Sequence, residues 1–186
     1  MRLRRLAAAR GAAYRTGVRA AVVVLAALVA AGASPPSEQQ IEQRRARIAK
    51  ELVPLGAELQ RHIVAGDANA LLALVPPDGL RCAGRLVPRA KVARDLRAQG
   101  TWLHDVYFGG SASPTRSGAP ASLAAFLRNA REIAILVSFQ PDPRAGPTGR
   151  PCIDFRAKNV ATPGAPLCFE KRDGRWWFTE CLYPCG

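Results

Sequence analysis

The chain has 186 residues, of which 27 are basic and 14 acidic, so its formal net charge is +13 at pH 7. It lacks the Gly-x-Ser-x-Gly, Gly-x-x-x-x-Gly-Lys-Ser/Thr and Gly-x-Gly-x-x-Gly motifs. This excludes the nucleophile elbow and the Gly-rich nucleotide-binding loops that those motifs mark.

The first residues have the pattern of an export signal. Residues 1–19 hold six arginines and no acidic residue, and residues 20–33 form an apolar stretch. The stretch ends in Ala31-Gly32-Ala33, the small-residue arrangement that signal peptidases cleave. We therefore expect a signal peptide over residues 1–33, cleaved after Ala33, and a single exported domain over residues 34–186, about 150 residues long.

An alternative is that the leader is retained as a membrane anchor through residues 20–33. A spanning helix needs about 20 apolar residues, so this stretch is short for an anchor. Removal of the leader leaves 21 basic against 14 acidic residues, so the mature net charge falls to about +7.

A long helix is expected from Ser37, which forms a capping box with Gln40, to Gly66. Apolar residues recur on one helical face along this segment. Pro54 lacks the amide that an interior helical residue donates, so we expect it to kink or divide the helix near Val53.

Shorter elements follow. Asp67 is expected to cap a helix over residues 68–74, and residues 80–86 to form a short strand or hairpin. Pro88 suits the first position of a third helix through residue 98, with Gly100 as its C-cap.

The middle of the chain alternates between apolar and loop-like segments. Residues 102–108 alternate as a strand, and residues 109–120 form a loop. A short helix is expected over residues 123–130. The continuous apolar run at residues 133–139 predicts a strand buried on both faces. A second loop, residues 141–151, follows it.

The last segment predicts strands over residues 152–158, 167–172 and 175–181. Asp173-Gly174 favours a two-residue type I′ turn between the last two. The resulting register pairs Phe169 with Phe178.

The predicted fold is α+β, with amino-terminal helices packed on a curved, mostly antiparallel sheet and a carboxy-terminal β-hairpin. The helical part covers residues 37–100, and residues 101–186 are mainly strands.

From Gln60 onward the chain resembles the cone-shaped nuclear-transport-factor-2-like superfamily. The resemblance is carried by the Gly66-Asp67 to Gly79 segment, the helix ending at Gly100 and the Asp173 to Trp176 hairpin. It implies a helical hairpin closing over a bent sheet. Members of that superfamily include enzymes, ligand binders and assembly domains, so no single function is implied.

Cysteine content supports export independently. In an oxidising compartment the five cysteines are expected to form disulfides, leaving one unpaired within the chain. The hairpin register allows a Cys168–Cys181 bridge, and Cys152 competes for either partner. Two bridges among five positions allow 15 pairings. The five candidates are Cys82, Cys152, Cys168, Cys181 and Cys185.

His104 is the one candidate catalytic residue. It could act as a general base near neutral pH, with Glu170 or Glu180 orienting it. The alternating strand would direct His104 and Asp105 to opposite faces, so we do not expect them to pair. His62 is expected to be a partly buried packing residue. No spacing indicates a metal site, and nothing implies a cofactor.

Basic residues cluster over 44–50, over 81–97 and on the last strands. Trp176 and Phe178 share a face with Phe169 and are expected in the core, whereas Trp177 is the better surface candidate. Export disfavours nucleic acid as a partner and favours an anionic cell-envelope surface or a protein. A membrane is a partner only if the leader is retained.

Two functions fit these observations. The first is an exported, disulfide-containing binding or interaction module of unknown ligand, located in the periplasm or outside the cell. The alternative is a small cyclase- or isomerase-like enzyme with a site built on His104 in a cone-shaped pocket.

Overall fold

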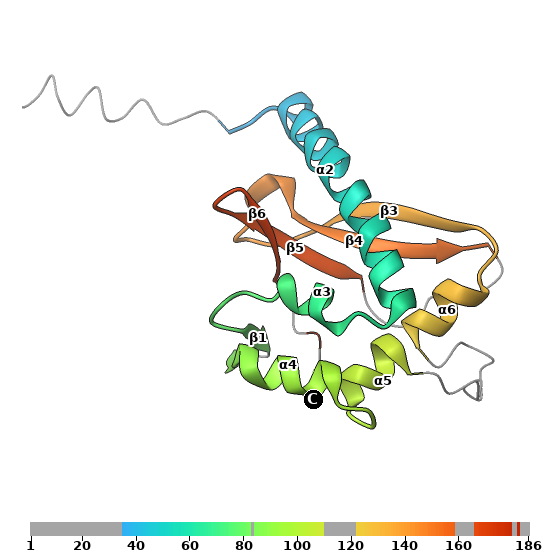
Figure 1. The fold of residues 1–186 in the computed structure, drawn as a ribbon. Helices are drawn as coiled ribbons and strands as arrows, with labels where there is room; N and C mark the ends of the chain where they lie inside the picture. Colours follow the sequence, from blue (N-terminus) through green and yellow to red (C-terminus); the bar gives the residue numbers. More distant parts are fainter. Residues whose placement is uncertain (1–34, 83, 110–121, 159–165, 180–181, 183–186) are drawn as a thin grey trace, which may run out of the picture. The chain divides into compact units, whose positions relative to one another are not determined.

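The computed structural model describes residues 35–82, 84–109, 122–158, 166–179 and 182 (Figure 1). The part from Ser37 onward forms one compact unit. The predicted leader with its cleavage site lies outside the described residues, as do Glu180, Cys181 and Cys185. No helix within the described ranges combines the length and the apolar character needed to cross a membrane.

The predicted α+β class and the carboxy-terminal hairpin are confirmed, and the sheet is antiparallel and open. The helices are α2 (Glu38–Ala65), α3 (Ala68–Ala73), α4 (Arg89–Arg97), α5 (Trp102–Phe108), α6 (Leu123–Asn129) and the 3₁₀ helix η1 (Gly146–Thr148). The strands are β1 (Leu80–Cys82), β2 (Arg85–Val87), β3 (Ile133–Gln140), β4 (Arg150–Ala157), β5 (Leu167–Arg172) and β6 (Arg175–Phe178).

Helix α2 begins at the predicted capping box. The Gln40 amide donates to Ser37 Oγ, and the Ser37 amide donates to Gln40 Oε1. The helix ends at Gly66, whose φ of 72° is left-handed. Pro54 does not divide it: its side chain is exposed, and the tertiary contacts of α2 on either side of the proline hold one 28-residue helix.

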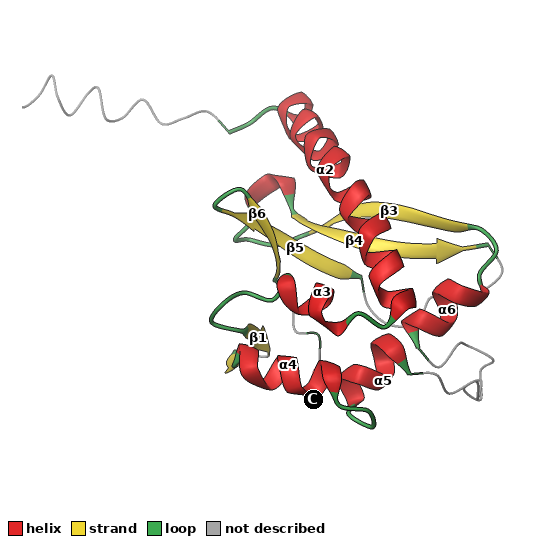
Figure 2. Ribbon diagram, in the orientation of Figure 1, coloured by secondary structure: helices red, strands yellow, loops and turns green. Residues whose placement is uncertain are grey.

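Helix α2 lies across the sheet (Figure 2). Its apolar stripe supplies Leu52, Leu59 and Ile63 to the core. Gly56 lets the helix approach β3 closely, since a Cβ at this position would lie 2.6 Å from Ile135 Cγ2. The absence of a side chain at Gly56 therefore allows α2 to pack directly on the sheet.

The predicted strand at residues 102–108 is wrong, because this segment is helix α5. Thr101 caps it by accepting a hydrogen bond from the His104 amide. Leu103 and Tyr107, four residues apart, are both buried, whereas Trp102 is exposed. Burial of residues four positions apart is typical of a helix, so the apparent alternation of apolar and polar residues does not indicate a strand here. The part after residue 100 thus holds α5 in addition to the expected short helix near residues 123–130.

The boundaries of α4 also differ from the prediction. Pro88 lies at its N-cap, one position before the helix, and the helix ends at Arg97 with Ala98 as the C-cap. Gly100 comes later, in a left-handed conformation in the connection to α5. There the Gly100 amide donates to Asp105 Oδ1.

Strand β3 is not buried on both faces, contrary to the prediction. Ile133, Ile135 and Val137 pack against the core, but the Leu136 side chain is 47% exposed on the opposite face. Exposed side chains alternate with partly buried ones along the strand, at Ala134, Leu136 and Ser138, so one face of β3 is left open.

The sheet is paired unevenly. Strands β3 and β4 pair along their full length, from Ile133↔Ala157 to Gln140↔Arg150. Strands β4 and β5 pair only at Ile153↔Leu167 and Cys152↔Cys168. The sheet therefore forks directly after the Cys152–Cys168 pair.

The hairpin register is confirmed. Phe169 pairs with Phe178, and the turn residues Asp173 and Gly174 both have positive φ, at 50° and 76°. Thr179 continues the register beyond β6, because its amide donates to the Cys168 carbonyl. Residues 180 and 181 of the predicted strand lie outside the described residues.

Candidate functional site: a basic pocket at the fork of the sheet

A pocket of about 490 Å³ opens where β4 and β5 separate. Thr148 to Pro151 line one side of it, and Phe169 to Arg172 line the side where strand pairing would otherwise continue. Its volume falls within the range of small-molecule sites. The fork in the sheet therefore creates a cavity.

Local sequence explains why pairing stops there. Pro151 has no amide hydrogen and cannot donate to a ladder. Gly149 has a φ of 77°, and a Cβ there would lie 2.8 Å from the Gln140 carbonyl oxygen. Arg150 donates to Asp142 Oδ2 from Nε at 2.8 Å and from Nη2 at 2.5 Å, which holds the chain before β4 in a closed turn. This turn directly precedes the part of β4 that is not paired with β5.

The disulfide Cys152–Cys168 joins the last paired residues before the fork. Both cysteines are buried. Of the bridges left open by the sequence, this one forms, and the Cys168–Cys181 alternative is wrong. Cys82 is also disulfide-bonded, and the remaining cysteines of the chain, Cys181 and Cys185, lie outside the described residues.

Helix α2 forms a second wall of the pocket through Glu51. Glu51 Oε2 accepts hydrogen bonds from Lys171 Nζ at 2.5 Å and from Trp176 Nε1 at 3.1 Å. These contacts tie α2 to the β5–β6 hairpin. Nearer the start of α2, Arg45 Nε donates a hydrogen bond to the Thr148 carbonyl at 3.1 Å. This contact ties the same helix to η1.

The pocket lining is basic. Six basic side chains face four acidic ones, and three of the acidic groups already have basic partners. The pairs are Glu51 with Lys171, Asp142 with Arg150, and Glu170 with Arg172. The remaining lining charges are Arg44, Arg81, Arg144 and Asp78.

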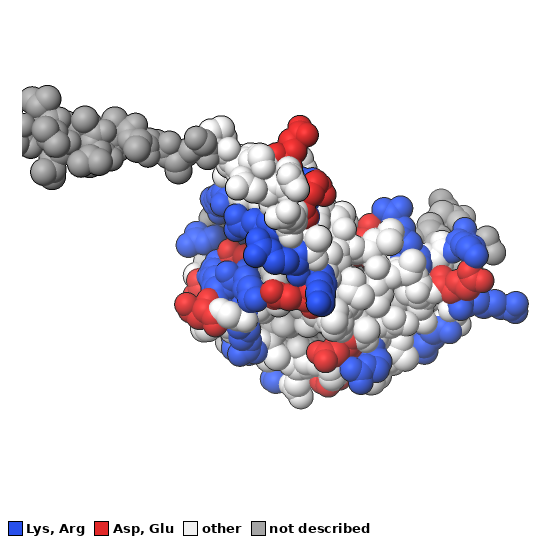
Figure 3. Space-filling model, turned by 90° about the horizontal axis from the view of Figure 1, so that it is seen from above, with Lys and Arg blue, Asp and Glu red and all other residues white. Residues whose placement is uncertain are grey.

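Three of the lining arginines lack a partner among the described residues. Within the described part of the chain, the guanidinium groups of Arg44, Arg81 and Arg144 make no hydrogen bond or ion pair. They come from α2, from β1 and from the turn before η1. Figure 3 shows Lys and Arg side chains gathered, with some acidic ones among them, on the side of the view where the β5–β6 hairpin lies in Figure 1.

Two of the lining carboxylates, Glu51 and Asp142, keep their charge at neutral pH. The hydrogen bond from Lys171 holds the pKa of Glu51 below its ordinary value, and Trp176 reinforces this. The backbone amide of Arg144 and the guanidinium of Arg150 lower the pKa of Asp142. Neither group is suited to act as a general acid near pH 7.

The floor of the pocket is apolar. Phe169 and Phe178 are buried, with ring centroids 5.0 Å apart, and Trp176 lies beside them. The buried Thr179 Oγ1, at the same floor, has no hydrogen-bond partner in the described part of the chain. Trp177, the predicted surface aromatic, stacks instead with the Arg175 guanidinium at 4.4 Å.

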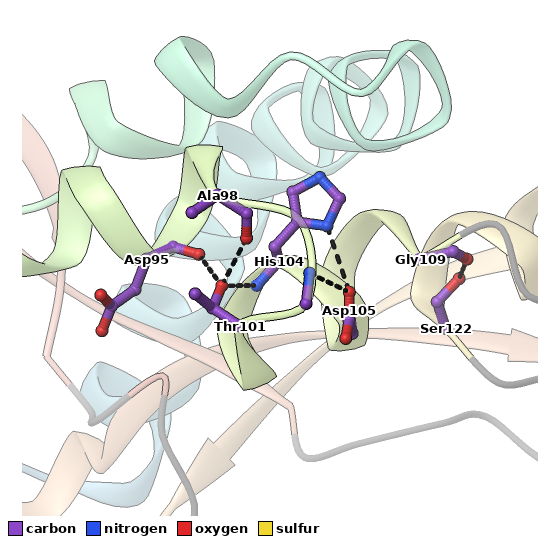
Figure 4. Close-up of polar contacts among 8 residues, drawn as sticks. Asp95, Ala98, Thr101, His104, Asp105, Gly109 and Ser122 are labelled. Carbon is purple, nitrogen blue, oxygen red and sulfur yellow. Dashed lines mark hydrogen bonds and ion pairs between the residues drawn. The ribbon is translucent and has the colours of Figure 1, made fainter.

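His104 does not belong to this pocket. It lies on α5, where Nδ1 is 3.3 Å from Asp105 Oδ1 (Figure 4). Its ring packs edge-on against Phe108. The expectation that His104 and Asp105 point to opposite faces was wrong, because neighbouring side chains on a helix diverge by only about 100°. Glu170, a proposed partner, lines the pocket at the fork instead.

His62 is partly buried, as expected, but it has a polar partner. Its Nδ1 lies 3.0 Å from Oδ2 of Asp67, the residue that caps α3. Across the described residues, no group of three or more His, Cys, Asp or Glu side chains is arranged to hold a metal ion.

The sequence pointed to Arg44 and Arg81 as members of two separate basic clusters, and the fold brings both to one cavity. The sequence analysis did not identify Asp142 and Arg144 as pocket residues, because they lie in a segment predicted only to be a loop. The Asp-Pro-Arg run there is a turn signal, and Asp142 Oδ1 does accept from the Arg144 amide at 2.9 Å.

No protein-family model matches the chain, and the searches of curated proteins and of solved structures gave no match. The candidate site thus depends on the geometry described above.

Proposed function

We propose that this chain is an exported, disulfide-containing binding module whose pocket at the fork of the sheet binds an anionic ligand. The observation that carries the proposal is that three arginines without an ion-pair partner among the described residues, Arg44, Arg81 and Arg144, line one cavity whose basic side chains outnumber its acidic ones. Like charges gathered without partners repel each other, and an anionic ligand removes that repulsion.

The remaining chemistry of the pocket fits such a ligand. The apolar floor supplies contact area, and guanidinium groups bind carboxylate or phosphate oxygens in a bidentate manner. The buried Thr179 hydroxyl offers a further hydrogen bond. These features support recognition of a molecule that has both an anionic group and an apolar part.

Export is supported by the leader pattern and by the Cys152–Cys168 disulfide, since disulfides persist mainly in oxidising compartments. In that setting an anionic cell-envelope component or an acidic protein is the natural partner. The likeness to the nuclear-transport-factor-2-like superfamily stays a prediction. No observation favours the enzymatic alternative, because His104 lies outside the pocket lining.

The test uses citrate as a small polyanionic probe and thermal unfolding as the readout. We expect citrate to raise the melting temperature of the mature protein above that in sodium chloride of equal ionic strength. A ligand at 100 times its Kd stabilises by about 2.7 kcal/mol. The triple variant Arg44→Gln, Arg81→Gln, Arg144→Gln is expected to lose at least tenfold in citrate affinity.

Arg47→Gln is the matched control. Arg47 is exposed on the same helix as Arg44 and does not line the pocket. It should bind citrate like the wild type. Equal citrate affinity in the triple variant and the wild type, with unchanged circular dichroism, would refute the proposal.

A further inference from the structure

The pocket exposes a strand edge as well as charge. Along the β5–β6 hairpin, hydrogen-bonded and non-hydrogen-bonded pairs alternate. The Thr179 amide donates to the Cys168 carbonyl, so Cys168 belongs to the hydrogen-bonded set, together with Glu170 and Arg172. Lys171 belongs to the other set, and its backbone N–H and C=O point away from β6.

On the edge that faces away from β6, this part of β5 is not paired with another described strand. Pairing with β4 ends at Cys152↔Cys168 within the described residues. Continued in register, Phe169 would face Pro151 and Lys171 would face Gly149, but the pocket lies between these segments. The peptide group of Lys171 therefore faces the cavity and not another strand.

The open edge has the dimensions of a short peptide site. The segment Phe169–Arg172 spans about 13 Å at the rise of a β-strand. An unpaired strand edge is a template for a further strand, and several peptide-binding domains recognise their ligands in this way. The 490 Å³ cavity beside this edge provides the space that an added strand needs.

Resting on the proposed function, we propose that the pocket binds an extended acidic peptide segment, which adds as a strand to the β5 edge at Lys171. The row of backbone groups selects an extended peptide over a compact anion. The arginines on α2, on β1 and before η1 select acidic side chains.

The probe is a fluorescein-labelled, amidated hexapeptide of alternating valine and glutamate. Two N-methylated versions of it block the backbone amides at odd or at even positions, and a third version replaces glutamate by glutamine. We expect the parent peptide to bind the mature protein. One methylated version and the glutamine version should bind at least tenfold more weakly, and the other methylated version should bind like the parent.

Amide hydrogen exchange, resolved by residue with NMR, locates the added strand. The Lys171 amide should exchange at least tenfold more slowly when the peptide is bound. The Glu170 amide is the internal control, because it already pairs with Trp177 and should change little.

The outcomes separate the two proposals. Equal binding by both methylated peptides, or an unchanged Lys171 exchange rate, overturns strand addition. If citrate still binds in an arginine-dependent manner, the anionic site survives that result. If neither peptide nor citrate binds, both proposals fail.

Discussion

At the scale of single residues, Glu51 connects three parts of the site. One carboxylate oxygen accepts from Lys171 Nζ and Trp176 Nε1, so α2, β5 and β6 meet at this side chain. The Lys171 ammonium also lies 5.6 Å from the centroid of the Trp176 ring. Glu51 thus orients one wall of the pocket, although it is about half exposed.

Replacing Glu51 by Gln should lower the free energy of unfolding by about 1 kcal/mol at neutral pH, a value typical of a partly exposed ion pair. The folded-state pKa of Glu51 is depressed below 4.5. Its contribution is therefore complete above pH 4.5 and is lost as the pH falls through the lowered pKa. Urea unfolding of wild type and variant at several pH values measures this.

Glu58→Gln is the control for this prediction. Glu58 is exposed on the same helix, and no partner exists for it within the described part of the chain. Its removal should leave the stability within about 0.5 kcal/mol at every pH. An E51Q deficit as large at the lowest pH of the series as at neutral pH would contradict the assigned cause.

At the scale of elements, tertiary packing overrides two local signals. In α5, the apparent strand pattern yields to a helix, since Thr101 caps it and Leu103 and Tyr107 share a buried face. In α2, Pro54 is accommodated inside one helix, since Leu52 and Leu59 on either side of it are buried. Burying one apolar side chain stabilises the fold by about as much free energy as these unfavourable local preferences cost.

Pro54→Ala should stabilise the protein by about 1–3 kcal/mol, because alanine restores the amide that the helix interior lacks and removes the ring clash. Pro54 is exposed, so no core contact is lost. The reverse change, Ala57→Pro at another exposed position of α2, should destabilise by about 3 kcal/mol. Thermal melts of the two variants should shift in opposite directions, and a lower melting temperature for P54A would show that the proline is needed in α2.

At the scale of the whole molecule, the disulfide that stabilises the sheet lies next to the proposed binding pocket. The Cys152–Cys168 disulfide holds β4 and β5 together at their last pair, and the pocket begins at the next position. The hairpin side of the pocket is further anchored where Arg175 Nη2 donates to the Ala73 carbonyl at 2.7 Å and the Phe178 amide donates to the Leu74 carbonyl at 2.8 Å.

The variant Cys152→Ala, Cys168→Ala should lose about 3 kcal/mol of stability, the value for a closed loop of about 15 residues. The bridged cysteines are 16 residues apart. Denaturant unfolding measures the loss. Non-reducing peptide mapping of the exported protein should recover the Cys152–Cys168 link and an amino terminus at Ser34. A Cys168–Cys181 link, or five free thiols, would contradict the prediction.

The sequence by itself determined the features that depend on neighbouring residues. These include the capping box at Ser37, the left-handed end at Gly66, the Asp173-Gly174 turn with its register, and the mixed α+β class. Each follows from local backbone chemistry or from periodicity, which a single chain segment carries. The leader and its cleavage after Ala33 stay predictions of this kind.

Only the tertiary structure decided what depends on distant residues. It selected Cys152 as the partner of Cys168, left one face of β3 uncovered at Leu136, and separated β4 from β5. The pocket arises from that separation, and Arg44, Arg81 and Arg144 meet there only because three elements converge on it. The sequence of one segment does not indicate which distant segment it will contact, because that depends on which apolar surfaces become buried together in the folded chain.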